Sequence, residues 1–244
     1  MKYWSHREGT SGQEVERIQK ILNIKQDGKY GPITKAAVEQ FQSSNNLSVD
    51  GIVGPQTRKE MAIDIYAGID VSRWQGDIDW DTLKSSGLVD FCWVKVTEGN
   101  THVHKGSPHN ISECRRLNVP VGGYHFARPD LHTDPYKEVE NFVKNCPMEV
   151  GDLKPVFDFE VAGGTHDKES LRVWAVDFLE EFEKESGIRP VVYTGGNMVK
   201  YKLKSTKILE DYILWHALYS KRAIEMGIPK DRLGGWKEWR IWQW

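Results

Sequence analysis

The sequence lacks a strong charge of either sign, a cysteine framework and any long apolar run. Its 33 basic and 35 acidic residues leave a formal net charge of −2, so no broad basic field is available to attract nucleic acid. The cysteines are three, widely spaced and without a CxxC pair, which indicates reduced, buried thiols: Cys92, Cys114 and Cys146. No stretch approaches the roughly 20 apolar residues that span a bilayer, and the start, MKYWSHREGTSGQ, has no secretory apolar core. We therefore expect a soluble cytosolic protein without membrane or nucleic-acid partners.

Aromatic residues, by contrast, are plentiful. They make up 11% of the 244 residues and include 10 tryptophans, a loading that suits a surface for flat sugar rings. Ordinary core packing is the alternative explanation. Length alone fits either one large domain or two unequal ones.

The first sixty-odd residues contain an internal repeat. DGKYGPIT at 27–34 returns as DGIVGPQT at 50–57. The Asp-Gly pair predicts a tight turn, the second glycine is expected to relieve a strained backbone position, and the proline should begin a helix. Apolar residues at helical spacing in QEVERIQKIL and TKAAVEQFQ, and the short PQTRKEMA, predict three small helices tied by two matched turns.

These helices and the duplicated DGxxGPxT motif resemble the peptidoglycan-binding domain that accompanies many wall-degrading enzymes. The resemblance covers residues 8–64, and we expect a binding domain at 1–64. A small structural bundle, whose repeat serves only turn geometry, is the alternative.

From Tyr66 onward, short apolar runs alternate with helical segments. Helices are expected at 134–145 and at 168–186, the second ending at Gly187. Strands that alternate with helices predict a mostly parallel sheet. The fold class is therefore α/β, with an irregular β/α barrel over residues 65–244 after the small three-helix domain.

The segment PVFDFEV at 155–161 reads as a buried strand that carries two carboxylates. Residues two apart share a face of a strand, so Asp158 and Glu160 should lie side by side. Glycoside hydrolysis needs a proton donor and a second negative group, and a nearby carboxylate helps to keep its neighbour protonated. A salt bridge across the sheet is the alternative, with Lys95 as the one basic residue in a comparable strand.

Seven motifs in order resemble glycoside hydrolase family 25: GIDVSRWQG, VKVTEG, GGYHF, PVFDFE, VVYTG, LWHALY and WRIWQW, over residues 66–244. The resemblance implies a lysozyme that cuts the β-1,4 bond between N-acetylmuramic acid and N-acetylglucosamine. It implies Glu160 as general acid, with Asp70 and Asp158 stabilising the cationic centre. Covalent attack and assistance by the acetamido group of the substrate both stay open; we favour assistance, with Asp158 orienting that group.

The resemblance also implies a saccharide groove at the carboxyl ends of the strands, where polar and aromatic side chains gather. The residues expected to bind substrate there are Glu98, Tyr124, His125, Tyr193, Trp215, Tyr219 and Trp242. Members of the family continue past this point into a further strand with an acidic residue, so we expect a shortened C-terminal end of the barrel.

Three histidines in THVHKGSPH, His102, His104 and His109, form the one tempting zinc cluster. A polar loop explains them equally well, and the family resemblance calls for no metal or cofactor.

The two modules together resemble a bacteriophage endolysin, a monomer made in the host cytoplasm that reaches peptidoglycan after the membrane is opened. Two other functions stay open. One is a wall-binding protein with an inactive barrel, and the other is a metal-dependent wall peptidase or amidase.

Overall fold

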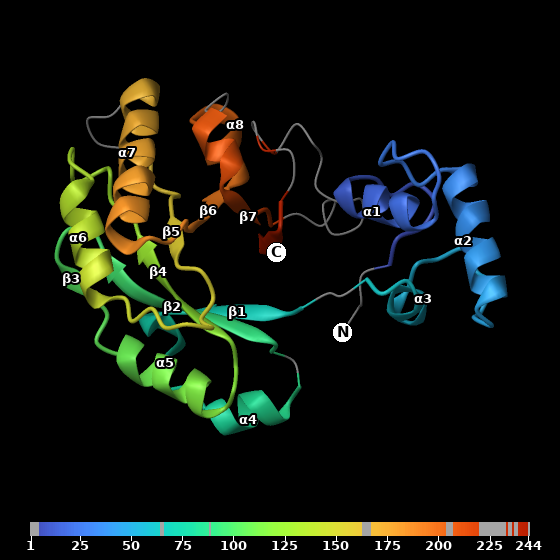
Figure 1. Ribbon diagram of the computed structural model, residues 1–244, viewed down its shortest axis with the longest axis horizontal. Helices are drawn as coiled ribbons and strands as arrows, with labels where there is room; N and C mark the ends of the chain where they lie inside the picture. Colours follow the sequence, from blue (N-terminus) through green and yellow to red (C-terminus); the bar gives the residue numbers. More distant parts are fainter. Residues whose placement is uncertain are drawn as a thin grey trace. The chain divides into compact units, whose positions relative to one another are not determined.

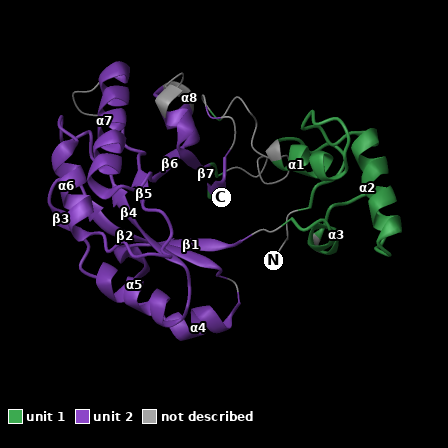
Figure 2. Cartoon of the chain, viewed as in Figure 1, with its two compact units in different colours: residues 1–65, 218–233, 243–244 green, residues 66–217, 234–242 purple. Residues whose placement is uncertain are grey.

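The computed structural model describes residues 5–63, 66–87, 89–162, 167–203, 207–219 and 239–243, together with Leu233 and Trp236. The chain divides into two compact units (Figure 2). One comprises residues 1–65 with 218–233 and 243–244, and the other comprises 66–217 with 234–242. Within the described residues, no helix is both long and apolar enough to cross a bilayer.

The N-terminal unit contains the three predicted helices, α1 (Gln13–Ile21), α2 (Pro32–Ser44) and α3 (Pro55–Glu60) (Figure 1). Their apolar faces meet in one small core, which consists of Val15, Ile18, Tyr30, Val38, Val53, Met61 and Ile63. The hydroxyl of Tyr30 donates to the carbonyl of Gly51 at 2.9 Å, which ties one copy of the repeat to the other.

Each Asp-Gly turn places its first glycine in the left-handed region, with φ of 67° at Gly28 and 65° at Gly51. The prediction that the second glycine relieves strain is wrong. Gly31 and Gly54 have φ of −98° and −88° and are extended caps before α2 and α3, whose prolines stand in the first turn as expected.

Each of the two repeated turns is held in shape by one buried glutamine side chain. The amide nitrogen of Gln19 donates to the Asp27 carboxylate at 2.8 Å and to the Lys29 carbonyl and Thr34 hydroxyl at 3.0 Å. The side-chain oxygen of Gln19 accepts from the Gly28 amide at 2.9 Å. One side chain thus satisfies the backbone of a whole turn, as buried polar groups require.

Gln42 repeats this arrangement in the second copy. Its amide nitrogen bonds Asp50 at 2.8 Å, the Ile52 carbonyl at 3.0 Å and Thr57 at 3.1 Å, and its oxygen accepts from the Gly51 amide at 2.9 Å. Both glutamines are 1% exposed. The repeat therefore extends beyond the eight-residue motif to a glutamine on the preceding helix.

The larger unit is built on one mostly parallel sheet with the order β1-β2-β4-β5-β6-β7-β8. The strands are β1 (Gly68–Val71), β2 (Phe91–Glu98), β4 (Val121–Phe126), β5 (Val156–Asp158), β6 (Val191–Gly195), β7 (Ile213–Ala217) and β8 (Ile241–Gln243), with β3 (His102–Val103) antiparallel on β2. The predicted irregular β/α barrel takes the form of a curled sheet whose path begins at β1 and ends at β8 (Figure 1).

Helices connect and cover these strands. They are α4 (Trp80–Ser85), α5 (Ser107–Arg116), α6 (Tyr136–Asn145), α7 (Lys168–Ser186) and α8 (Gly196–Tyr201), with 3-10 turns η1 (Arg73–Gln75) and η2 (Lys207–Asp211). Helix α7 ends as predicted, because Gly187 takes φ of 70°. Helices α6 and α7 pack on each other and bury the aromatic side of the sheet (Figure 1).

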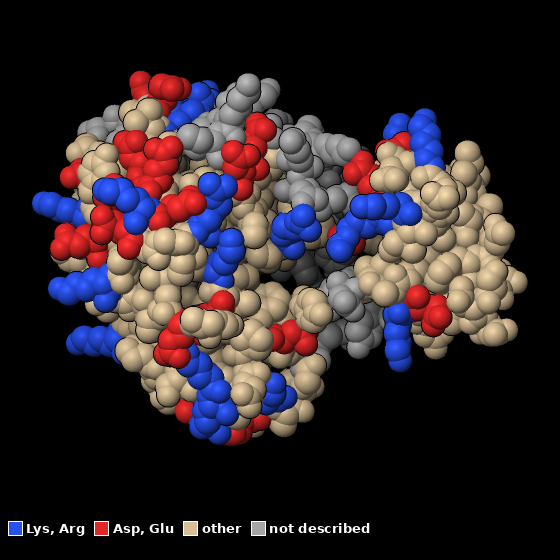
Figure 3. All heavy atoms as spheres, in the orientation of Figure 1, with Lys and Arg blue, Asp and Glu red and all other residues tan. Residues whose placement is uncertain are grey.

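The surface and the thiols agree with the composition. Basic and acidic side chains are interspersed over the face shown in Figure 3. Cys92, Cys114 and Cys146 are buried and free, as the spacing predicted.

We expect Gln42→Ala to destabilise the N-terminal unit by about 2–4 kcal/mol, because it leaves the buried Gly51 amide and other turn groups without partners. Hydrogen exchange of peptides from residues 11–61 in the full chain measures this loss. Gln40→Ala, an exposed position on the same helix, is the matched control and should change little. Equal protection in both variants would contradict the central role of Gln42.

Candidate active site

The carboxylates of Asp158 on β5 and of Glu160 just beyond it face away from the helices. Phe157 and Phe159 are fully buried and stack on aromatic rings of α7, with centroid distances of 4.3 and 5.9 Å. Alternation along the strand then turns Asp158 and Glu160 to the opposite, inner face of the sheet. Asp70 on β1 faces the same side, since its register partner Trp93 belongs to the inner apolar cluster.

The backbone that carries Glu160 is held beyond the end of β5. The Phe159 amide donates to the Tyr193 carbonyl at 2.9 Å, and the Thr194 hydroxyl donates to the Phe159 carbonyl at 2.7 Å. The Ala127 amide donates to the Asp158 carbonyl at 2.9 Å. Both acids therefore stand on a fixed backbone although only Asp158 lies in the strand itself.

Burial raises the pKa of both carboxyls. Asp158 is 7% exposed and its Oδ1 atom has no hydrogen-bond partner. Burial, then the charge of Glu160, raises the pKa of Asp158 well above its usual range. Burial also raises the pKa of the more exposed Glu160, to which Asp70 adds while Lys95 opposes it. The pair therefore keeps a proton at a pH where isolated carboxyls are ionised.

Lys95 does not pair with these acids. Its Nζ atom donates to Glu98 Oε2 at 2.7 Å, and the ion pairs of the described residues include none between Lys95 and Asp158 or Glu160. The alternative of a salt bridge that neutralises the two acids is therefore wrong for this structure. The acid pair lies near a cation without being bound by it.

Glu98, expected to bind substrate, is engaged by two cations. Besides Lys95, Arg128 donates to Glu98 Oε1 at 2.8 Å, and the same guanidinium grips Asp130 with two bonds of 2.8 Å. Burial acts to raise the pKa of Glu98, but the hydrogen bonds from Lys95 and Arg128 outweigh it and hold that pKa below its usual value. Glu98 is thus an anion under these contacts.

Three of the predicted aromatic residues lie together on the inner face. Tyr124, Tyr193 and Trp215 share one buried cluster with Trp93, whose ring is 4.6 Å from that of Trp215. Burial, then the charges of Asp158 and Asp70, raises the pKa of the Tyr124 hydroxyl. We call the rings of Tyr124, Tyr193 and Trp215 the aromatic floor, and they lie on the same face of the sheet as the acids.

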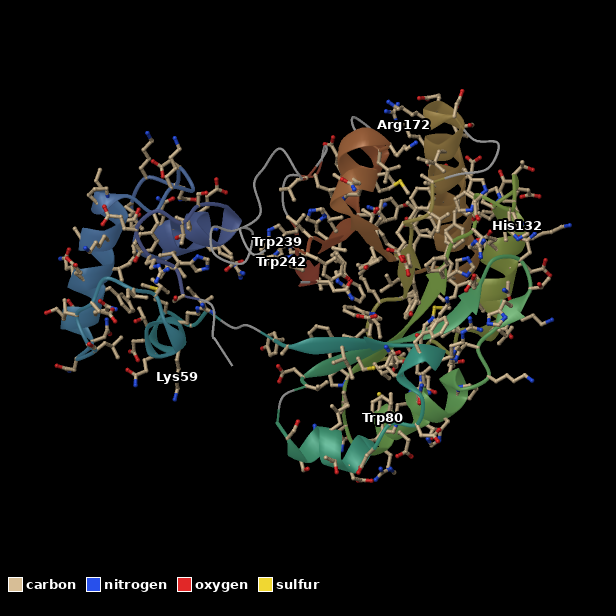
Figure 4. The ribbon with its side chains drawn as sticks, turned by 180° about the vertical axis from the view of Figure 1, so that it is seen from behind. Lys59, Trp80, His132, Arg172, Trp239 and Trp242 are labelled. Carbon is tan, nitrogen blue, oxygen red and sulfur yellow. The ribbon has the colours of Figure 1, made fainter. Side chains whose placement is uncertain are left out.

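Tyr219 and Trp242 are not members of that buried cluster. The Tyr219 hydroxyl donates to Gln243 Oε1 at 2.6 Å, and Tyr219 belongs to the segment that groups with the N-terminal unit. Trp242 on β8 lies edge-on to Trp239 with ring centroids 5.9 Å apart (Figure 4). Their contact with a substrate stays a prediction.

The position of His125 corrects the prediction made for it from the sequence. It is 0% exposed and lies on the outer face of β4, next to but opposite Tyr124, which faces inward. Its Nδ1 atom is 2.8 Å from the Thr97 hydroxyl and its Nε2 atom is 2.8 Å from Glu138 Oε2, a carboxylate with no exposed surface. A side chain sealed under α6 and α7 does not touch a substrate, so the expectation that His125 binds substrate is wrong.

The three histidines of the predicted zinc cluster are not gathered. No group of three or more histidine, cysteine or acidic side chains with metal-binding geometry occurs in the described part of the chain. Burial lowers the pKa of His104, which is 7% exposed.

Sequence reasoning missed one exposed aromatic residue beside Asp70. Trp74 in η1 is 78% exposed, and the guanidinium of Arg73 lies 4.6 Å from its ring centroid. A capping box between Ser72 and Gln75 fixes this turn. The signal was present in SRWQG, which follows Asp70 directly, and an exposed ring suits stacking on a sugar.

Two family models match the chain. A model of glycosyl hydrolases family 25 matches residues 69–244, and a model of a peptidoglycan binding domain matches residues 11–61. The first covers all the acids described above. The second covers both copies of the repeated turn.

Individual proteins agree with these matches. The uncharacterized protein YegX of Escherichia coli (strain K12) is 30% identical over 180 residues, which cover 72% of this chain and 61% of YegX. The autolytic lysozyme of Clostridium acetobutylicum is 31% identical over 153 residues, which cover 62% of this chain and 44% of that enzyme. The solved bacterial lysozyme from Streptomyces coelicolor superposes with a TM-score of 0.64 at 25% identity, over 75% of this chain and 84% of that one. The chain spans less than two thirds of the length of the first two.

We expect Asp158→Asn to stabilise the larger unit at pH 7 by about 1–3 kcal/mol, because it removes a buried carboxylate that lacks a full set of partners. A carboxyl whose pKa is raised by folding costs stability as pH rises from its unfolded-state pKa, about 4, toward the raised folded-state pKa, so the gain should vanish below about pH 4. Urea unfolding followed by tryptophan fluorescence measures it. The exposed Asp77→Asn serves as control, and a loss of stability at pH 7 in Asp158→Asn would contradict the prediction.

Proposed function

The chain belongs to glycosyl hydrolase family 25, and we propose from its acid pair that it is an N-acetylmuramidase, a lysozyme acting on bacterial peptidoglycan. The observation that carries the proposal is that Asp158 and Glu160 lie on the inner face of the sheet, each with a raised pKa. The charge of Asp70 acts on both of them. Two carboxyls with a retained proton are what glycoside hydrolysis requires.

Exposure assigns the roles within the pair. Glu160 is the accessible member, so it donates its proton to the glycosidic oxygen as the bond to the anomeric carbon breaks. Asp158 orients the acetamido group of the substrate, whose oxygen attacks the anomeric carbon and takes up its positive charge. Asp70 stabilises that charge, and Glu160 then accepts a proton from the water that completes hydrolysis.

A sugar placed over Glu160 strengthens this assignment. Covering the carboxyl removes it further from water, which raises its pKa in the same direction as burial already does. Proton retention by Glu160 and binding of the substrate therefore support each other. The aromatic floor of Tyr124, Tyr193 and Trp215 supplies the apolar surface under the sugar rings.

The N-terminal domain, residues 1–64, binds peptidoglycan in this proposal, and residues 65–244 form the catalytic domain. A polymer held by one domain is presented to the other at a raised effective concentration, so two weak contacts act together. The match of residues 11–61 to a peptidoglycan binding domain supports this division.

Digestion of purified peptidoglycan followed by mass spectrometry of the fragments tests the activity. We expect new reducing ends on N-acetylmuramic acid, and we expect Glu160→Gln to lower the rate by about 10²–10⁴-fold because it removes the proton donor. Asp77→Asn, exposed and outside the acid pair, is the control. Reducing ends on N-acetylglucosamine, or an active Glu160→Gln, would contradict the assignment, and binding to sacculi without sugar release would indicate an inactive barrel.

The biological role that fits both modules is that of a phage endolysin, which lyses the host from within. A wall-binding domain joined to a muramidase is the combination such a role needs.

We expect the chain, expressed in a bacterial host, to leave cells intact until a membrane-permeabilising agent is added, and to lyse them rapidly afterwards. Culture turbidity measures this, with Glu160→Gln as the matched inactive chain. Lysis that begins without permeabilisation, or that proceeds equally with the inactive chain, would contradict the endolysin role.

A further inference from the structure

Among the described residues, Lys95 is a cation whose charge acts on both members of the acid pair. Its ammonium lies 4.4 Å from the ring centroid of Phe126, and Phe126 is the register partner of Asp158 on the neighbouring strand. The charge of Lys95 acts on both Asp158 and Glu160, and it lowers the pKa of each against the effect of burial. Lys95 is therefore close enough to influence both acids without being bonded to either.

A direct bond between Lys95 and Asp158 would be chemically favourable. Asp158 Oδ1 is buried without a hydrogen-bond partner, and a lysine ammonium has three donors on a flexible stem. A closer ammonium would also lower the pKa of Glu160, the proton donor, further than Lys95 already does, and so release the proton that catalysis needs. The observed bond goes elsewhere, to Glu98 at 2.7 Å.

Glu98 is itself restrained from the other side. Arg128 donates to its second oxygen at 2.8 Å and is locked in place by the two-pronged bond to Asp130. The Arg128 backbone amide donates to Glu138 Oε2 at 3.1 Å, and Glu138 is fully buried on α6. Lys95 is thus connected to the interior of the domain through its ion pair with Glu98 and through the ion pair of Glu98 with Arg128.

We propose that Glu98 and Arg128 are positioning residues that hold the Lys95 ammonium away from Asp158 and Glu160, so that the acid pair keeps its catalytic proton. This inference rests on the proposed muramidase function. It gives Glu98 a role different from the substrate contact that its motif implied.

Other charged groups also act on the carboxyls of Asp158 and Glu160, and they limit the effect that Lys95 has on the pKa of each. Asp70 from β1 acts on both acids, Glu98 from β2 acts on Asp158, and Tyr124 from β4 is perturbed by Asp158, Asp70 and Glu160. Removing Glu98 therefore has two consequences: it frees Lys95, and it deletes one negative charge near Asp158. The first lowers the pKa of Glu160 and moves the alkaline limb of the activity profile to lower pH, whereas the second lowers the pKa of Asp158, and a single variant does not separate them.

A double-mutant cycle separates the two consequences. In the pH profile of kcat/KM on peptidoglycan, which reports the free enzyme, we expect Glu98→Gln to move the alkaline limb down by about one pH unit or more. Lys95→Met should move it up. In the Lys95→Met background, Glu98→Gln should move it little, because no ammonium remains to be released. A full shift in that background, or no shift in Glu98→Gln alone, would overturn the proposal.

Glu183→Gln on α7 is the matched control, since it breaks a comparable ion pair with Arg189, which follows that helix, and should leave the profile unchanged. NMR titration of carboxyl-labelled full-length chain gives a readout that does not depend on turnover. We expect the two perturbed carboxyls to titrate lower in Glu98→Gln, and we expect Glu160 to be insensitive to that change once Lys95 is Met. If wild-type chain released no sugar, the muramidase proposal would fail alone, and this titration would decide the role of Glu98.

Discussion

The two-residue period of strand β5 is the constraint on which the site depends. One face of that strand supplies Phe157 and Phe159 to the aromatic layer under α7, and the other supplies Asp158 and Glu160. The phenylalanines fix the strand because they are fully buried, and the strand in turn fixes the acids. A slip of one residue would bury both carboxylates among the helices and expose both rings, so packing of the core and placement of the chemistry are the same requirement.

Much of this arrangement could be predicted from sequence. The duplicated turn, the three helices, the end of α7 at Gly187 and the inner position of Tyr124 follow from local rules of spacing and capping. His125 could have been excluded by the alternation of side chains along a strand, because the adjacent residues Tyr124 and His125 point to opposite faces. Both were expected in the saccharide groove because the motif GGYHF resembles the family, and that expectation did not use the period of two.

Long-range polar contacts could not be predicted. Nothing local in EVERIQKIL marks Gln19 as the centre of a turn that begins several residues later, and only the match with Gln42 in the second copy reveals it. Which of several nearby acids Lys95 would bond was equally unpredictable from the sequence. It depends on where Arg128 brings Glu98, and Arg128 is placed by Glu138 from a different helix.

The buried polar groups of the two units differ in a way that separates scaffold from chemistry. Gln19 and Gln42 use both ends of their amides, so each leaves its turn satisfied and rigid. Asp158 keeps an oxygen without a partner in a place where a lysine is within electrostatic reach. A fold selected for stability alone would close that gap with one salt bridge. In the proposed mechanism ion pairs occupy the lysine elsewhere and maintain this gap, so the unsatisfied carboxyl serves the proposed reaction rather than the stability of the fold.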